Sequence, residues 1–218
     1  SVATGVWVGV GARDEPDELC GASHFLEHLL FKGTETRSAQ DIARAVDLVG
    51  GDVNAFTTKE YTAFYCRLPA RHAGVAFDIL GDVLTRPALR HDDLETERQV
   101  ILEEIAMDDD DPDDVVHRVL AEEVFPDHPL GRDTAGFRET IEAIGVDDVR
   151  AFFARWYRAG SMVVSVAGPH DHAEMVADVE RSFRALPIGG ERPTRIGPGP
   201  TGSGRIVADD TEQVHLAV

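Results

Sequence analysis

The stretch GASHFLEHLLF, at residues 21–31, carries two histidines four positions apart with a glutamate between them. On a helix, His24 and His28 lie on one face about a turn apart, within reach of a single metal ion. The apolar residues of the stretch recur at the spacing of a mostly buried helix, namely Phe25, Leu26, Leu29 and Leu30. The stretch therefore predicts one helix that belongs to the core and also carries a metal site.

Glu27 lies three residues after His24, close to the same face but off the line that joins the two histidines. Zinc binds imidazole and carboxylate groups tetrahedrally and lowers the pKa of a water that it binds. A carboxylate beside that water can take its proton and deliver it to a leaving amine. The HxxEH motif thus predicts Zn²⁺ as cofactor, His24 and His28 as ligands, and Glu27 as the catalytic base of peptide hydrolysis.

The alternative is that His24 and His28 are ordinary half-buried histidines. The chain holds nine His and seventeen Glu. At this composition HxxEH arises by chance roughly 0.03 times in a chain of this length. A third ligand would separate the two interpretations.

Candidates for that ligand lie in ETERQVILEEIAM, residues 95–107. Glu97 and Glu104 are two helical turns apart and share a helix face to within about 20°, whereas Glu103 points about 100° away from Glu104. One of the pair can bind the metal while the other orients a ligand histidine. The alternative for this helix is a solvated acidic face, and the HxxEH motif favours the metal-site interpretation.

Strand-like and helical patterns alternate along the chain and predict one compact α+β domain, with a largely antiparallel sheet packed against helices. Ser38 with Asp41 resembles a capping box, and Gly50 with Gly51 a helix end. Strands are expected at residues 2–10, at 161–168 and from 205 onward. Residues 52–69 are expected to form two strands, or one long strand with a turn near 57–60. The expected helices are residues 21–31, 38–51, 71–84, 92–107, 113–124, 147–158 and 172–187.

The formal net charge of −19 argues against a nucleic-acid partner, which would need clustered Lys and Arg.

Cys20 and Cys66 have no metal-binding or redox spacing, and a reduced protein is the simplest interpretation. No run of residues is apolar enough to suggest a membrane span. We expect a bacterial-type cytoplasmic protein. Because Ser1 leads directly into a strand-like run, we also expect that an upstream segment is missing.

Several segments resemble signatures of the pitrilysin and mitochondrial-processing-peptidase family of zinc metallopeptidases, the inverzincins, whose HxxEH inverts the commoner HExxH order. The segments occur in the family's order and span nearly the whole chain. They are GASHFLEHLLFKGT at 21–34, GG and NAFTTKEYT within 50–62, ERQVILEEI at 97–105, HPLGR at 128–132 and QVHLAV at 213–218.

The resemblance implies roles for particular residues. Its third metal ligand is a glutamate seventy-odd residues beyond the second histidine, which matches Glu104, and its supporting catalytic glutamate matches Glu97. Asn54, Ala55 and Phe56 would line the cleft in which a peptide substrate adds as an extended strand.

The resemblance also implies a domain plan in which two or four α+β halves close on a peptide. Residues 1–188 would form the zinc-peptidase catalytic domain, 189–204 a Gly/Pro-rich linker, and 205–218 the start of a truncated second domain. The partner half would lie in the same chain or in another chain, and a homodimer is a further option. We expect this chain to bind zinc but to hydrolyse peptides poorly without that half.

Two alternatives remain. S-ribosylhomocysteine lyase also uses an HxxEH helix on a related fold, but with a cysteine ligand that neither Cys20 nor Cys66 matches. Non-catalytic scaffold or partner subunits keep the fold and lose the motif, whereas this chain retains the two histidines and both glutamates of the predicted site.

Overall fold

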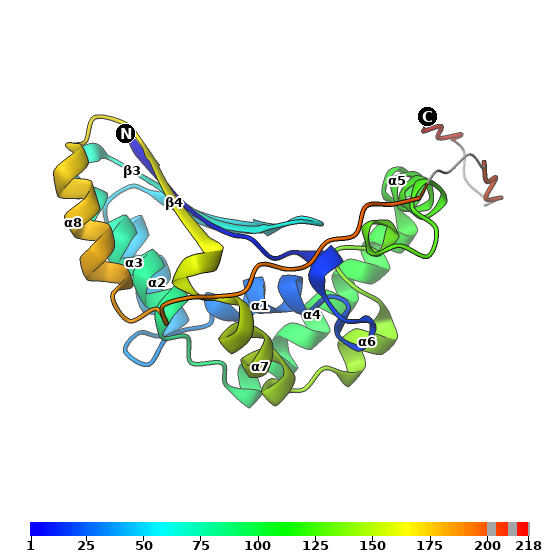
Figure 1. Cartoon of the computed structure of the whole chain (residues 1–218), viewed down its shortest axis with the longest axis horizontal. Helices are drawn as coiled ribbons and strands as arrows, with labels where there is room; N and C mark the ends of the chain where they lie inside the picture. Colours follow the sequence, from blue (N-terminus) through cyan, green and yellow to red (C-terminus); the bar gives the residue numbers. More distant parts are fainter. Residues whose placement is uncertain (200–203, 209–212, 218) are drawn as a thin grey trace.

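A four-stranded antiparallel sheet forms one layer of the molecule (Figure 1). The computed structural model describes residues 1–199, 204–208 and 213–217. The strand order is β2-β3-β1-β4, and every neighbouring pair is antiparallel. The strands are β1 (Val2–Val8), β2 (Asp52–Thr57), β3 (Thr62–Leu68) and β4 (Met162–Ala167). This arrangement confirms the predicted α+β class with a largely antiparallel sheet.

The hairpin formed by β2 and β3 confirms the two strands expected within 52–69. Thr57 pairs with Thr62 at its closed end, and the Thr58 amide donates to the Tyr61 carbonyl across the turn (2.9 Å). Since β3 then pairs with β1 on its other side, β2 is left at the edge of the described sheet.

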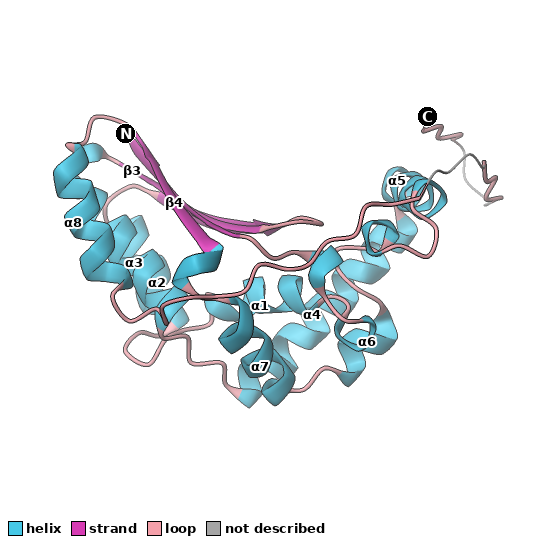
Figure 2. Ribbon diagram, in the orientation of Figure 1, coloured by secondary structure: helices cyan, strands magenta, loops and turns pink. Residues whose placement is uncertain are grey.

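Apart from α5, which extends beyond the end of the sheet, the helices lie on one side of the sheet (Figure 2). The first four are α1 (Ala22–Leu30), α2 (Ala39–Asp47), α3 (Ala73–Thr85) and α4 (His91–Asp110). The others are α5 (Pro112–Val124), α6 (Arg138–Ala143), α7 (Val146–Trp156) and α8 (His172–Phe183). α6 was not predicted because its six residues are too few to show a helical period. α4 extends three residues beyond the predicted end, and Pro112 then begins α5.

The start of α2 has the local chemistry that its sequence predicts. The Ser38 hydroxyl accepts from the Asp41 amide (3.2 Å), and the Asp41 carboxylate accepts from the Ser38 amide (3.0 Å). After the helix, Gly50 adopts a φ of 70°, which favours glycine. The Gly51 amide then donates back to the Val46 carbonyl (3.2 Å). The capping box and the glycine ending are both confirmed.

The core lies between the sheet and the helices. Phe25, Leu26 and Phe64 are fully buried there. On the other face of the sheet, aromatic rings contact one another yet remain partly exposed, with exposed fractions of 38% for Trp7 and 36% for Phe56. The helices therefore cover one face of the sheet and leave an aromatic surface on the other.

The end of the chain differs from the prediction. Residues 205–208 and 213–217 form no strand, and the predicted strand positions 209–212 and 218 lie outside the described residues. A strand needs a neighbour that pairs with its backbone groups, but these residues lie against α5, where Arg205 pairs with Glu122 (2.9 Å).

The division into domains at 188 and 204 stays a prediction. No helix in the described part of the chain is long and apolar enough to cross a membrane.

Candidate metal centre

α1 presents three partly exposed side chains, and they are the three residues of the HxxEH motif. His24, Glu27 and His28 are half-buried, while every other residue of α1 is buried. Since the remaining positions pack into the core, this exposed stripe is held rigidly. The helix therefore projects two imidazoles and one carboxylate from a fixed platform.

A buried carboxylate anchors the start of α1. Glu15, only 4% exposed, accepts from the Gly21 amide (2.7 Å) and from the Ser23 amide (2.6 Å). These amides belong to the first turn, where a helix leaves its N–H groups without internal partners. Gly21 itself has a φ of 94°, and a Cβ there would meet the Ala135 carbonyl oxygen at 2.6 Å. The chain before the motif thus fixes where the helix begins.

α4 carries Glu97 and Glu104, the two carboxylates that face the histidines of α1. Leu94, Glu97 and Ile101 are buried on one side of this helix, and Glu104 follows on the same side two turns after Glu97. The apolar members of the face hold α4 against its neighbours. The two glutamates are thereby directed towards α1 and its histidines.

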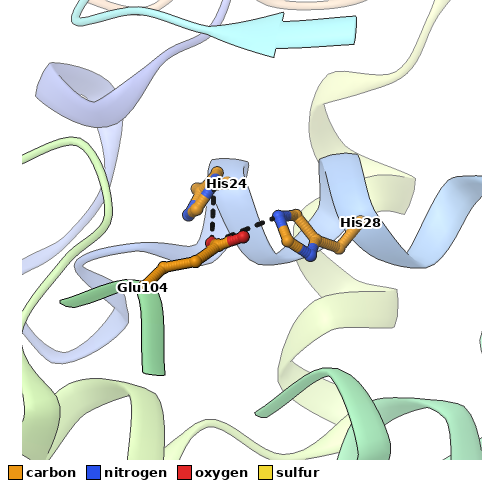
Figure 3. A group of neighbouring side chains, drawn as sticks. All are labelled: His24, His28 and Glu104. Carbon is orange, nitrogen blue, oxygen red and sulfur yellow. Dashed lines mark ion pairs between the residues drawn. The ribbon is translucent and has the colours of Figure 1, made fainter. Parts of the chain in front are cut away.

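The structure brings His24, His28 and Glu104 together (Figure 3). Glu104 Oε2 lies 3.8 Å from His24 Nε2 and 3.6 Å from His28 Nε2. One ligand atom from each residue lies within 4.8 Å of the other two, and the described residues contain one group of this kind. Ligand atoms of a tetrahedral zinc ion are separated by about 3.3–3.4 Å, as bond lengths of about 2.0–2.1 Å require. Two imidazoles and a carboxylate at this spacing fit zinc.

The surroundings of His24 favour the neutral form of its imidazole. Burial, followed by the neighbouring His28, lowers the pKa of His24 to about 4. The ring is therefore neutral at pH 7 and has a lone pair to offer. Its Nδ1 is buried and has no hydrogen-bond partner among the described residues.

Glu97 lies behind His28, on the side away from Glu104. It is 3% exposed, and its Oε2 lies 3.1 Å from His28 Nδ1. Its other oxygen, Oε1, lies 2.7 Å from Lys32 Nζ. Glu97 is therefore placed to orient the imidazole of His28, and its supporting role stays a prediction. Lys32 was not predicted as part of the site, although it follows His28 by four residues and so extends the spacing of the two histidines.

Glu27 is held by the end of β2. The Thr57 hydroxyl donates to Glu27 Oε2 (2.6 Å). Burial raises the pKa of Glu27, and the hydrogen bond from Thr57 partly opposes that shift. A carboxylate with a raised pKa is a stronger base than an ordinary surface glutamate, as a general base requires. Thr57 was not predicted as part of the site either, because no sequence pattern connects it to Glu27.

Asn54, Ala55 and Phe56 all lie in the edge strand β2. Asn54 is exposed, Ala55 is buried, and Phe56 is 36% exposed. The Ala55 amide donates to the Asn54 side-chain oxygen (2.8 Å). These residues therefore lie along the edge that leads, through Thr57, to Glu27. Their role in binding a substrate stays a prediction.

The chain matches known protein families over nearly its whole length. Residues 1–138 match the family described as "Insulinase (Peptidase family M16)", and residues 143–218 match "Peptidase M16 inactive domain". The second match includes β4, which pairs with β1 in the same sheet.

Relatives and solved structures agree with this assignment. The chain is 45% identical over 221 residues to an uncharacterized zinc protease of Mycobacterium leprae, covering 99% of this chain and 50% of that protein. It is 39% identical over 218 residues to the zinc protease YmxG of Bacillus subtilis, covering 100% of this chain and 53% of that protein. Pitrilysin superposes with a TM-score of 0.81 at 25% identity, covering 92% of this chain and 22% of pitrilysin. A protease from Helicobacter pylori gives a TM-score of 0.83 at 24% identity, covering 91% and 48%.

The fold and the site's donor set define a chain of the metallopeptidase class. It belongs to peptidase family M16, as the resemblance in its sequence predicted. The chain spans about half the length of the curated relatives that it matches. The cysteine-ligated alternative gains no support, since the group of candidate metal ligands in the described residues contains neither Cys20 nor Cys66.

Proposed function

We propose that this chain is the metal-binding half of a zinc metalloendopeptidase. The observation that carries the proposal is the convergence of His24, His28 and Glu104 from α1 and α4 within 4.8 Å. The M16 family and the zinc protease names of the relatives support the same chemistry.

His24, His28 and Glu104 would hold the zinc ion. When bound, zinc supplies Lewis acidity that activates water and polarises a peptide carbonyl. Glu27 projects from the same stripe of α1, one residue before His28, and would accept the proton of the attacking water at its carboxylate. The same carboxyl group would then return the proton to the leaving amine. Thr57 holds Glu27 in place for both transfers.

The substrate would bind as an extended strand along β2. This strand pairs only with β3 in the described sheet, so its outer edge can form main-chain hydrogen bonds with a peptide. Asn54, Ala55 and Phe56 lie along that edge, and Thr57 continues it to Glu27. A peptide in this position would place one of its carbonyls beside the metal site.

A second homologous half would complete the enzyme, in the same chain or in a partner. The chain spans about half of its relatives, and its sheet leaves Trp7, Phe56 and Tyr61 partly exposed. Exposed apolar patches commonly mark interaction surfaces. We therefore expect this chain alone to bind zinc tightly and to hydrolyse peptides slowly.

Zinc content and peptidase activity together test the proposal. We expect one zinc ion per wild-type chain, loss of zinc in His24→Ala, and retained zinc in Glu27→Gln. In the full-length protein, Glu27→Gln should lower kcat/KM by about 10²–10⁴-fold, the usual contribution of a general base. A wild-type chain without zinc would indicate a scaffold subunit, and an active Glu27→Gln variant would refute the assignment of the base.

A further inference from the structure

Lys32 occupies an unusual position for a cation in this protein. The chain contains only two lysines, Lys32 and Lys59, against nineteen arginines. In the described residues, Lys32 is the one Lys or Arg side chain that pairs with a carboxylate of the site, namely that of Glu97. The pair lies 2.7 Å apart and joins the end of α1 to the buried face of α4.

The Glu97 carboxylate lies between two donors. One oxygen lies 3.1 Å from His28 Nδ1, and the other lies 2.7 Å from Lys32 Nζ. A buried carboxylate is costly unless it is paired and hydrogen-bonded, and Glu97 is only 3% exposed. Lys32 compensates its charge and holds one oxygen, so the other oxygen is left to accept from His28.

The acceptor on Nδ1 decides what His28 can do at its other nitrogen. When Nδ1 carries the hydrogen and donates it, Nε2 has the free lone pair. Nε2 is the atom that faces Glu104, at 3.6 Å from its carboxylate. The orientation of Glu97 therefore fixes both the tautomer and the direction of the ring.

Lys32 also offsets part of the negative charge of the site. Glu27, Glu97 and Glu104 carry three formal negative charges, and a zinc ion supplies two positive ones. Lys32 supplies the third. Without Lys32, the buried Glu97 carboxylate would keep His28 as a partner but lose its cation.

We propose that Lys32 is a positioning residue for the metal centre, holding Glu97 in the orientation in which it accepts a hydrogen bond from His28. This proposal rests on the proposed zinc-peptidase function and extends it by one residue. Lys32 would act on the metal site through Glu97 and His28. Its effect should therefore appear in zinc affinity and in the tautomer of His28, apart from any effect on stability.

The test compares zinc affinity in wild type, Lys32→Met, Lys32→Arg and Arg86→Met, by competition with a chelator of known affinity. Arg86 is a matched control because it also lies 2.7 Å from a buried carboxylate, that of Asp82, which keeps its contact with Arg37. We expect Lys32→Met to bind zinc about tenfold more weakly, in the range found for residues that support metal ligands. Lys32→Arg and Arg86→Met should stay close to wild type.

Nitrogen NMR of the zinc-free chain gives a second readout that does not depend on activity. His28 should be held in the Nδ1–H tautomer in wild type and become a mixture of tautomers in Lys32→Met. Equal zinc affinity and equal tautomer populations in wild type and Lys32→Met would refute the role of Lys32 but leave the proposed function intact. Weaker zinc binding in Lys32→Met with unchanged tautomer populations would also refute it, since Lys32 would then not act through the orientation of His28. If the wild-type chain binds no zinc, the proposed function itself fails.

Discussion

Glu15, Glu27 and Glu97 lie on or beside α1, and each has a different set of donors. Glu15 accepts from backbone amides at the helix start, Glu27 accepts from a threonine hydroxyl, and Glu97 is paired with a histidine and a lysine. The same functional group thus serves to anchor the helix, to act as the proposed base, and to orient a proposed ligand. At the scale of the residue, the donors around each carboxylate decide which role it can take.

Glu15 should make stability depend on pH. Burial outweighs its amide donors and raises its pKa from 4.5 to about 7. Between these values the folded chain binds more protons than the unfolded chain, so the contribution of Glu15 to stability falls as the pH rises. Relative to Glu15→Gln, wild type should lose up to about 1.4 kcal/mol of unfolding free energy per pH unit across this window. Urea unfolding at several pH values measures the difference.

The control for this prediction is Glu18→Gln, because Glu18 is an exposed glutamate in the same loop. It should keep the pH dependence of wild type. Parallel stability curves for wild type and Glu15→Gln would contradict the raised pKa of Glu15.

At the scale of the elements, the segment 189–199 has no regular secondary structure, yet ion pairs and hydrogen bonds attach it to the rest of the chain. Arg195 pairs with the Asp14 carboxylate (2.7 Å), whose side chain is 1% exposed. The neighbouring Ile196 carbonyl accepts from Arg13 (2.9 Å), and His128 Nε2 lies 3.0 Å from it. Figure 1 shows this segment running across the molecule from α8 towards α5. Its Gly and Pro content predicts a linker, but side-chain contacts fix its path.

Trypsin cleavage tests this attachment, since the bond between Arg195 and Ile196 lies within the contacts. Asp14→Asn should speed cleavage there by about tenfold or more. Hydrogen bonds to charged groups contribute about 1.5–3 kcal/mol, and about 1.4 kcal/mol is a factor of ten. Asp17→Asn is the matched control, because Asp17 pairs with Arg132 instead. Equal cleavage rates in wild type and Asp14→Asn would show that the ion pair does not hold the segment.

The elements show where prediction from sequence succeeds. The α1 motif, the hairpin of β2 and β3, and the Ser38 cap of α2 were all predicted, because each depends on residues close together in the chain. The bond from Thr57 to Glu27 and the pair of Lys32 with Glu97 were not predicted, because 30 and 65 residues separate the partners. Strands expected at 205–208 and 213–217 did not form, because strand formation depends on a neighbour that local sequence does not specify.

At the scale of the whole molecule, the face of the sheet opposite the helices leaves aromatic rings partly exposed in the described part of the chain. Trp7 lies on it at 38% exposure and contacts the rings of Phe56 and Tyr61. The other tryptophan, Trp156, is 5% exposed in α7. The two tryptophans therefore report separately on the open face and on the core.

We expect the proposed second half to cover Trp7. In a Trp156→Phe background, adding that half as a separate polypeptide should shift the fluorescence of Trp7 to shorter wavelength, because the ring leaves water. Trp7→Phe, which retains Trp156, should show little change. A complex that gains peptidase activity without any shift of Trp7 would place the second half elsewhere on the molecule.

The sequence by itself determined the helix with its HxxEH stripe, the two-turn spacing of Glu97 and Glu104, and the antiparallel α+β class. These follow from local periodicity and from hydrogen bonds between near neighbours, which a chain carries wherever it folds. Only the tertiary structure decided that Thr57 holds Glu27, that Lys32 holds Glu97, and that Glu15 anchors α1. Each of these contacts joins separate segments, and packing of the helices against the sheet sets the distances between them.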